Sequence, residues 1–363
     1  MKRTLSIDLR WIDSSGIGTY IKGLMPGLVT ALHDVRIVGI GPKERLQEFP
    51  WASAPHVELV DCNVARYSPA EQLLLPRAIP RGTDLFFSPH YPIPLLYRGR
   101  IAVTVHDLSH LVVPEIAGNL AKRTYAKTML RRVRRRASLI LTVSNFSKAE
   151  LLRFTQGPRS DNIVAIHEGV SEMWYGASNA PRPRTRPYIV YVGNVKPYKN
   201  VSRLVEAFLK VMGSIQHDLV IIGQHEGLIT GESDGFFRLA RSAPDRVEFT
   251  GYVSRDQLLA LVGNADALVL PSLYEGFGFP PLEAMAAGVP ALVARAASLP
   301  EVCGEAVLYC DPLSVDDIAS GIVTIVTNES LRSRLVSAGG EQVRKYTWEL
   351  CAEQTAHAIR SVL

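Results

Sequence analysis

The sequence has few cysteines and no long apolar run, and each shortage excludes a class of protein. It has four cysteines: Cys62, Cys303, Cys310 and Cys351. Their scattered positions lack metal-ligand spacing and are typical of unpaired thiols in a reducing compartment. No apolar run reaches the ~18 residues that a membrane-spanning helix needs. The chain begins Met1-Lys-Arg-Thr and continues directly into an apolar strand without a secretory signal core, so we expect a cytoplasmic protein.

The length and the distribution of charge suggest two domains and an anionic partner. The chain has 363 residues, which is more than one hydrophobic core usually serves. The formal net charge is only +5, but the positive charge is uneven, because arginines are concentrated in one short stretch. These arginines are Arg131, Arg132, Arg134, Arg135 and Arg136. Such asymmetry indicates a phosphate-bearing partner or an anionic surface.

Short apolar runs alternate with longer amphipathic stretches along the whole chain. In the first half the expected strands are Leu5–Leu9, Val35–Ile40, Val57–Val60, Leu85–Ser88, Ile101–Val105 and Leu139–Val143. In the second half they are Tyr188–Val192, Leu219–Ile222, Val247–Phe249, Ala267–Leu270, Ala291–Ala294 and Val307–Tyr309. The helices expected between them include Thr19–Leu32, Ala117–Ala137, Lys148–Phe154, Val201–Val211, Ser254–Gly263 and Leu282–Ala287. This alternation predicts an α/β fold with two doubly wound parallel sheets.

A stretch without apolar periodicity separates the two series. Residues 176–187 contain three prolines and are expected to form an extended linker. The domains are therefore expected at 1–178 and 187–345. In open parallel sheets ligands bind outside the carboxyl ends of the strands, so we expect the chemistry in loops that follow strands.

The most specific motif follows the expected strand Ala267–Leu270 and reads Glu275-Gly-Phe-Gly-Phe-Pro-Pro-Leu-Glu283. Gly276 and Gly278 permit positive φ and a close approach of backbone N–H groups to a ligand. The two prolines suit the first turn of a helix, whose N-terminus favours a phosphate. Glu275 and Glu283 flank that position, where a carboxylate can accept two hydrogen bonds from the vicinal diol of a ribose or a sugar. The alternative is that both glutamates only cap the helix.

This motif resembles the paired-glutamate signature of the retaining GT-B glycosyltransferases of family 4. Three more segments resemble that family, and they are Val143-Ser-Asn-Phe-Ser-Lys148, Tyr191-Val-Gly-Asn-Val-Lys-Pro-Tyr-Lys-Asn200 and Thr250-Gly-Tyr-Val-Ser254. Together the four segments cover nearly the whole chain in the right order. The resemblance extends to bacterial mannosyltransferases of polysaccharide assembly. It implies two facing Rossmann-like domains, with residues 346–363 crossing back onto the first.

The resemblance also implies roles for single residues. Lys199 would contact the donor diphosphate, Glu275 the transferred sugar and Glu283 the nucleotide ribose. The implied catalytic set is His106, Lys199 and Glu275. The implied donor-binding set is Gly16, Gly18, Asn194, Lys199, Val253, Glu275, Gly276, Phe277, Gly278, Phe279, Leu282 and Glu283. Many family members carry an arginine in place of Asn194, so either Lys196 supplies that charge or Lys199 and backbone donors hold the diphosphate.

A pair of glycines in the first half admits a second interpretation. Gly16 and Gly18 follow the first expected strand and open a helix, as in a dinucleotide-binding loop. The third glycine of that fingerprint is missing, because Ile21 occupies its place. An NAD site is therefore not favoured, and the resemblance places this loop at the donor phosphates.

Histidines follow two strands of the first half. His106 ends the strand Ile101–Val105, and the resemblance places it near the donor sugar, where an imidazole can donate to a hydroxyl. A purely structural histidine is the alternative. His90 and Tyr91 follow the preceding strand and are expected on the acceptor side.

The arginine-rich stretch is predicted to form a basic amphipathic helix. Met129, Leu130 and Val133 form a narrow apolar stripe, and arginines fill most of the remaining circumference. We expect this face to dock on anionic lipid, with a merely solvated face as the alternative. Nucleic acid is disfavoured, because no interleaved aromatic residues accompany the arginines.

The sequence therefore predicts a retaining glycosyltransferase of surface polysaccharide or lipopolysaccharide synthesis. The donor is expected to be a nucleotide diphosphate hexose, with GDP-mannose favoured over UDP-sugars. The acceptor is expected to be a saccharide or a polyprenyl-diphosphate-linked oligosaccharide, at the inner face of the cytoplasmic membrane. No Asp-x-Asp pair is present, so neither an obligatory metal nor a cofactor is expected. The alternatives are a sugar-nucleotide epimerase or hydrolase and a non-catalytic nucleotide-sugar-binding protein.

Overall fold

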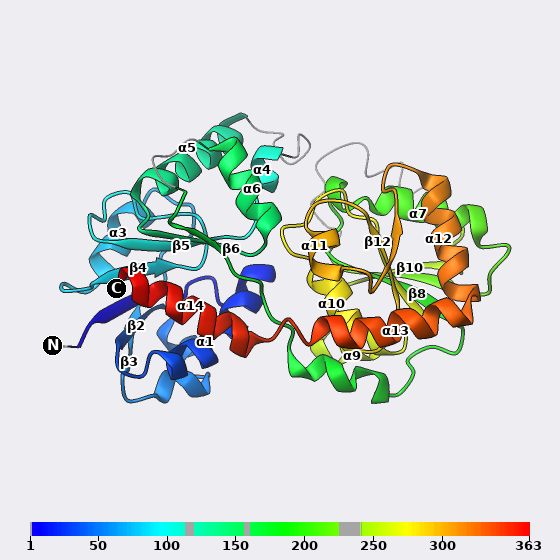
Figure 1. Cartoon of the computed structure of the whole chain (residues 1–363), viewed down its shortest axis with the longest axis horizontal. Coiled ribbons are helices and arrows are strands. Elements are labelled where there is room, and N and C mark those ends of the chain that lie inside the picture. Colours follow the sequence, from blue (N-terminus) through cyan, green and yellow to red (C-terminus); the bar gives the residue numbers. More distant parts are fainter. Residues whose placement is uncertain (1, 113–119, 156–159, 225–239, 241) are drawn as a thin grey trace. The chain divides into compact units, whose positions relative to one another are not determined.

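The computed structural model describes residues 2–112, 120–155, 160–224, 240 and 242–363. Two compact units make up the chain (Figure 1). The first comprises Met1–Gly169 with Tyr346–Leu363, and the second comprises Val170–Lys345. The segment 176–187, expected as a linker, therefore lies inside the second unit. Its first residues belong to the 3-10 helix η2 (Glu172–Asn179).

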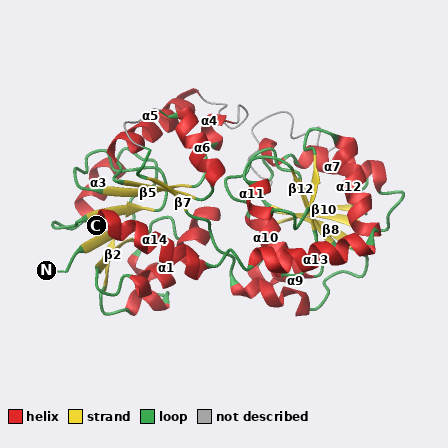
Figure 2. Cartoon of the chain, in the orientation of Figure 1, coloured by secondary structure: helices red, strands yellow, loops and turns green. Residues whose placement is uncertain are grey.

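The first unit is built on a seven-stranded parallel sheet with the order β3-β2-β1-β4-β5-β6-β7. Helices and strands of both units are distinguished by colour in Figure 2. The strands are β1 (Thr4–Asp8), β2 (Arg36–Gly41), β3 (Val57–Asp61), β4 (Leu85–Ser88), β5 (Ile101–Val105), β6 (Leu139–Thr142) and β7 (Ile163–Ala165). The helices are α1 (Gly16–Ala31), α2 (Lys43–Leu46), η1 (Pro50–Ser53), α3 (Glu71–Ala78), α4 (Ser109–Val112), α5 (Leu120–Arg136), α6 (Asn145–Phe154) and α14 (Trp348–Val362).

Successive strand residues face opposite sides of this sheet, and each side has its own core. Ile37 packs with α1 and α14, whereas its neighbour Val38 packs with α5. The final helix α14 can lie close to α1 because Gly23 has no side chain. A Cβ there would come within 2.1 Å of the Trp348 ring.

The second unit repeats the plan with six parallel strands in the order β10-β9-β8-β11-β12-β13. The strands are β8 (Tyr188–Val192), β9 (Asp218–Ile222), β10 (Val247–Gly251), β11 (Ala267–Leu270), β12 (Ala291–Ala294) and β13 (Leu308–Cys310). Besides η2, the helices are η3 (Pro197–Lys199), α7 (Val201–Val211), α9 (Arg255–Gly263), α10 (Phe279–Ala286), α11 (Leu299–Cys303), α12 (Val315–Thr327) and α13 (Glu329–Val343).

The prediction of two doubly wound parallel sheets is confirmed. The edge strand β7 was not predicted although its residues are apolar, because a run of three residues is shorter than a typical strand. Residues 117–119 of the predicted helix Ala117–Ala137 lie outside the described residues. Among the helices that the structure describes, none combines the length and the apolar composition needed to cross a membrane.

Candidate functional site

Most of the predicted site residues follow the central strands of the two sheets. The strand order reverses between β1 and β4 in the first sheet and between β8 and β11 in the second. Such a reversal opens a crevice at the carboxyl ends of the strands, where doubly wound folds bind ligands. Each unit therefore has its own candidate site.

Lys199 and Glu275 meet at the reversal of the second sheet. Lys199 ends η3 after β8, and Glu275 lies in the loop after β11. The Lys199 Nζ atom lies 2.7 Å from both carboxylate oxygens of Glu275. The two side chains are 18% and 9% exposed, so solvent screens this ion pair little. The ammonium group can donate to a phosphate oxygen, and the carboxylate can accept from a sugar hydroxyl.

Asn200, which the sequence did not single out, holds the lysine loop in place. Its backbone is left-handed, with a φ of 62°, a conformation that asparagine tolerates better than most residues. The buried Nδ2 group donates to the carbonyl oxygens of Pro271 at 2.9 Å and Pro312 at 2.7 Å. One amide thus joins the segments that follow β8, β11 and β13. The tolerance of asparagine for left-handed backbone was the one signal in the sequence that could have pointed to Asn200.

Ser298, which was also not predicted, fixes the glycine-rich loop. Its fully buried hydroxyl lies 2.9 Å from the carbonyl oxygens of both Glu275 and Phe277. Gly278 then precedes α10 with a φ of 107°, which is strained for residues that have a side chain. The loop that carries Glu275 is therefore held by a partner that follows β12.

Glu283 lies in the middle of α10 and has a different environment from Glu275. Burial raises the pKa of its carboxyl from 4.5 to about 7, although a hydrogen bond with the Trp174 side chain acts in the opposite direction. Trp174 comes from η2 and is buried. A carboxyl with this pKa can hold or release a proton near neutral pH, which a simple helix cap would not need.

Positive charge near Asn194 comes from two lysines. Asn194 is exposed in the loop after β8. Lys196 and Lys199 both lie over the Tyr198 ring, with Nζ 6.0 Å and 5.3 Å from the ring centroid. Both ammonium groups thus contact one ring in this loop, and the two explanations for Asn194 stay predictions. Within the described ranges, no three His, Cys, Asp or Glu side chains are grouped as a metal ion would require.

The remaining residues predicted to bind the donor in this unit lie in α10, directly before α10 and in the loop after β10. Leu282 is fully buried in α10. The rings of Phe277 and Phe279 meet edge to face, with centroids 5.5 Å apart. Val253 is half-buried directly before Ser254, whose side chain caps α9.

Of the two glycines after β1 in the first unit, Gly18 has a steric reason to be glycine and Gly16 has none. Gly16 begins α1, and a side chain there would meet no other atom. A Cβ on Gly18 would come within 2.5 Å of the Ile12 carbonyl oxygen, so close packing against its own loop demands glycine there.

His106 is held at both ring nitrogens. Its Nδ1 lies 3.1 Å from Glu168 Oε1, and its Nε2 lies 2.8 Å from the Pro89 carbonyl oxygen. Burial alone would lower the pKa of His106, but the hydrogen bond and charge of Glu168, together with the Pro89 carbonyl and the charge of Asp107, outweigh burial and raise it. To donate to a sugar hydroxyl, the imidazole must exchange one of these partners. Glu168, itself buried, was not predicted, because it lies 62 residues away in the sequence.

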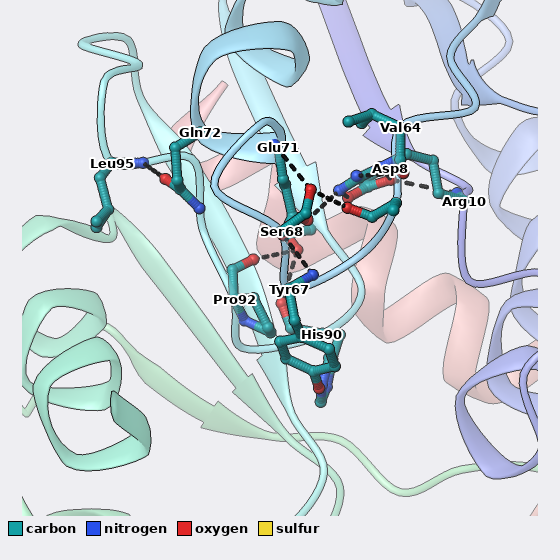
Figure 3. A network of polar contacts seen from close by, with 12 residues as sticks. Asp8, Arg10, Val64, Tyr67, Ser68, Glu71, Gln72, His90, Pro92 and Leu95 are labelled. Carbon is teal, nitrogen blue, oxygen red and sulfur yellow. Dashed lines mark hydrogen bonds and ion pairs between the residues drawn. The ribbon is translucent and has the colours of Figure 1, made fainter. Parts of the chain in front are cut away.

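His90 and Tyr91, which were expected to line an acceptor site, are 8% and 5% exposed. Both side chains form hydrogen bonds with Tyr67. The Tyr67 hydroxyl lies 2.9 Å from His90 Nε2 (Figure 3). It also shares a hydrogen bond with the Tyr91 side chain. Tyr67 itself is 50% exposed.

The apolar stripe of the arginine helix is not at the surface. Met129, Leu130 and Val133 are buried in the core of the first unit. Arg134 is buried too, while Arg131, Arg132, Arg135 and Arg136 are exposed. The chain's own sheet thus covers the apolar stripe, so the expected docking on anionic lipid would depend on the exposed arginines and stays a prediction.

Comparison with known proteins identifies the family of both units. Residues 14–172 match the family model described as "Glycosyltransferase Family 4", and residues 178–342 match "Glycosyl transferases group 1". The chain is 32% identical to O-antigen chain mannosyltransferase B of Escherichia coli over 76% of its own length and 74% of that protein's. Other curated relatives are matched over smaller shares of their length, between 27% and 59%.

Solved structures of similar fold cover almost the whole chain. Sucrose-phosphate synthase from Thermosynechococcus elongatus superposes with a TM-score of 0.76 at 21% identity, covering 99% of both chains. Anabaena HepE in complex with UDP and glucose superposes with a TM-score of 0.71 at 17% identity, covering 99% of this chain and 100% of the other. At these identities the structures show a shared fold. With the GT-B fold and the family models in agreement, the chain belongs to the family 4, group 1 glycosyltransferases.

Proposed function

We propose that this glycosyltransferase moves mannose from GDP-mannose to a saccharide or a lipid-linked oligosaccharide, with retention of the anomeric configuration. The observation that carries the proposal is the pair formed by Lys199 and Glu275 at the reversal of the second sheet. A cation beside a strand end suits a departing diphosphate, and the carboxylate beside it suits a sugar hydroxyl. The choice of mannose is supported by the O-antigen mannosyltransferase relative. The similar fold solved with UDP and glucose keeps UDP-sugars as the alternative donors.

In the proposed reaction, both bond changes take place on one face of the sugar. The bond from C1 to the diphosphate oxygen breaks with its electron pair on oxygen, and the acceptor oxygen bonds to C1 from the same side. The leaving diphosphate oxygen takes the acceptor proton. Lys199 then stabilises the charge that builds on the diphosphate, while Glu275 orients the sugar through its hydroxyls.

Before the donor arrives, Lys199 and Glu275 neutralise each other. The Lys199 ammonium has three protons to donate and can contact a phosphate while keeping a bond to Glu275. Glu283 would hold the ribose, and the start of α10 would meet the phosphates. We assign this charge stabilisation to the protein's own groups and propose that no divalent metal is required.

We also propose that the enzyme works at the cytoplasmic face of a membrane. The support is the row of exposed arginines on α5, of which Arg131, Arg132, Arg135 and Arg136 line one surface hollow together with Thr128. Because the apolar stripe of the helix is buried, contact with lipid would be electrostatic, worth about 1 kcal/mol per arginine near an anionic surface.

The test of the function compares Lys199→Ala with Lys210→Ala. Lys210 is a matched control, because it lies in the same unit and forms an exposed ion pair with Asp316. With GDP-mannose, a mannosylated acceptor and EDTA present, Lys199→Ala should lower kcat by about 100- to 1,000-fold, as the loss of one transition-state donor does. Lys210→Ala should not change kcat. Undiminished turnover by Lys199→Ala would refute the assigned role.

Two further readouts separate the competing functions. Thermal shifts with GDP, UDP, GDP-mannose and UDP-glucose identify the base, and Glu283→Ala should weaken the shift. The product is analysed with and without acceptor. Sugar release or epimerisation without acceptor, and no transfer with it, would indicate a hydrolase or epimerase instead.

A further inference from the structure

The first unit carries an aromatic cluster at the reversal of its own sheet. We call it the Tyr67 platform, and it consists of Trp11, Arg66, Tyr67, His90 and Tyr125. Trp11 follows β1, Arg66 and Tyr67 follow β3, and His90 follows β4. Tyr125 comes from α5. The cluster thus lies at the carboxyl ends of the strands, where a doubly wound sheet binds ligands.

Two rings of this platform are open to solvent. Tyr67 is 50% exposed and Tyr125 is 39% exposed, and their centroids lie 6.3 Å apart at an interplanar angle of 78°. Behind Tyr67, the edge-to-face ring of Trp11 lies 5.3 Å away and is almost fully buried. The Arg66 guanidinium lies over the same indole, 4.6 Å from its centroid, and bonds to the Ser14 hydroxyl. The open rings therefore stand among groups that can donate hydrogen bonds.

The backbone of Tyr67 is held in a conformation that a tyrosine rarely adopts. Its φ is 58°, in the left-handed region, which glycine, asparagine and aspartate tolerate better than other residues do. Glu71 Oε2 accepts the Tyr67 N–H at 2.8 Å, and Glu71 Oε1 accepts from Arg10 at 2.7 Å. Arg10 also donates to both oxygens of Asp8, at 2.8 Å and 2.6 Å (Figure 3).

This ionic triad of Asp8, Arg10 and Glu71 is buried, with exposures of 1%, 8% and 3%. Burying three charges is costly unless each is paired, and here one arginine serves two carboxylates. The hydroxyl end of Tyr67 is fixed as well, through His90 and Tyr91. Tyr67 is therefore held at its backbone and at its tip, while half of its surface remains open. Strained residues of this kind persist where the surroundings determine them, commonly at ligand sites.

We propose that the Tyr67 platform binds a hexose ring of the saccharide acceptor. The C–H face of a hexose packs on an aromatic ring, and Arg66 and the tyrosine hydroxyls can reach its hydroxyl groups. A ring that is already fixed loses little conformational entropy on binding. The polar surround of the rings fits a sugar better than the hydrocarbon chain of a lipid-linked acceptor. This inference rests on the proposed transferase function, whose donor site lies in the other unit.

The experiment uses the full chain with Tyr67→Gly and Tyr67→Phe. Glycine suits the left-handed backbone, so Tyr67→Gly removes the ring while the loop can still fold. Tyr67→Phe keeps the ring and loses only the hydroxyl. Leu96→Ala is the control, because Leu96 is a 59% exposed apolar residue of the same unit. Tyr125→Ala removes the second open ring.

Kinetics are measured with mannosyl oligosaccharide acceptors, with and without a lipid tail. Tyr67→Gly should raise the acceptor KM about tenfold or more, in line with the loss of one stacking contact, and leave the GDP dissociation constant within about twofold. Tyr125→Ala should raise the acceptor KM by a smaller factor. Tyr67→Phe keeps the ring but loses the hydroxyl that fixes it, so it should raise the acceptor KM by a smaller factor than Tyr67→Gly, and Leu96→Ala should not differ from wild type.

Other outcomes would refute the Tyr67 platform, and the proposed transferase function is tested independently of them. An unchanged acceptor KM in Tyr67→Gly, with transfer still dependent on Lys199, would refute the platform alone. A rise in KM confined to the lipid-tailed acceptor would assign the rings to lipid and refute the sugar. If the wild-type protein transfers no sugar, saturation-transfer NMR measures whether it still binds the saccharide. This measurement separates the platform from the proposed transferase function. Saccharide signals that vanish in Tyr67→Gly would support the platform without the transferase, and no saccharide binding by wild type would overturn it.

Discussion

Glu283→Gln should make the protein more stable at high pH and leave its stability unchanged at low pH. The wild-type carboxyl has a pKa of about 7 in the folded protein and 4.5 in its ordinary environment. Between these values the folded state keeps the proton that the unfolded state releases, so the free energy of unfolding falls as pH rises from 4.5 to 7. At about 1.4 kcal/mol for each pH unit, the total loss is about 3 kcal/mol.

Glutamine has nearly the same shape and does not titrate in this range. Its advantage over the wild type should therefore be near zero at pH 4.5 and about 3 kcal/mol at pH 8. For a unit of this size, 1 kcal/mol corresponds to roughly 2–4 °C in Tm, so the variant should melt about 6–12 °C higher at pH 8. Calorimetry at pH 5 and pH 8 measures the difference, with Glu305→Gln, at an exposed carboxyl of the same unit, as control.

A Tm difference between Glu283→Gln and wild type that is equal at both pH values would refute this reasoning. The same proton bears on the proposed donor site. If the ribose requires the Glu283 carboxylate, GDP binding must expel the proton below pH 7, and the GDP dissociation constant should rise as pH falls. An affinity that stays constant from pH 8 to pH 5.5 would indicate that the ribose does not contact the ionised carboxylate.

Two further results are expected from the first unit. Glu168→Gln removes the carboxylate that raises the His106 pKa, so this pKa should fall in an NMR titration of the ring. If the imidazolium is the active form, the pH above which activity declines should fall with it; an unchanged titration would contradict the role of Glu168. Replacing Arg131 and Arg135 together by glutamate should abolish co-sedimentation with phosphatidylglycerol vesicles at low salt, whereas Arg81→Glu should not. Equal binding by all three proteins would remove α5 from the proposed membrane contact.

The sequence predicted the two sheets and singled out the glycine-rich loop after β11 because both signals are local. Strands such as Tyr188–Val192 and Ala267–Leu270 are continuous apolar runs, and the structure gives them the same bounds. The glycines, prolines and glutamates of residues 275–283 are neighbours in the chain, so their spacing alone indicates a phosphate-binding loop. The resemblance then supplied the order of the motifs.

The supports of the site could not be predicted, because they depend on contacts between distant segments. Asn200 bonds to Pro312, which is 112 residues away, and Ser298 bonds to Glu275, which is 23 residues away. No periodicity marks a single buried amide or hydroxyl. Tyr67 was missed for a related reason, since nothing in its neighbourhood shows that Glu71 and Arg10 fix its backbone.

Amphipathicity and position in the sequence do not reveal which surface a residue faces. His90 follows a strand, as site residues do, yet it is buried and supports Tyr67. The apolar stripe with Met129 could have faced lipid or a sheet, and the periodicity is the same in both cases. Only the packing of α5 decides between them.

The bridging amide of Asn200 has a consequence for how the second unit opens. Because it ties the segments after β8, β11 and β13 together, none of these loops can detach without breaking a buried hydrogen bond. They should therefore exchange their backbone amide hydrogens as one cooperative unit. A nucleotide that contacts only one loop would then slow exchange in all three, and Asn200→Ala would let each loop exchange at its own rate.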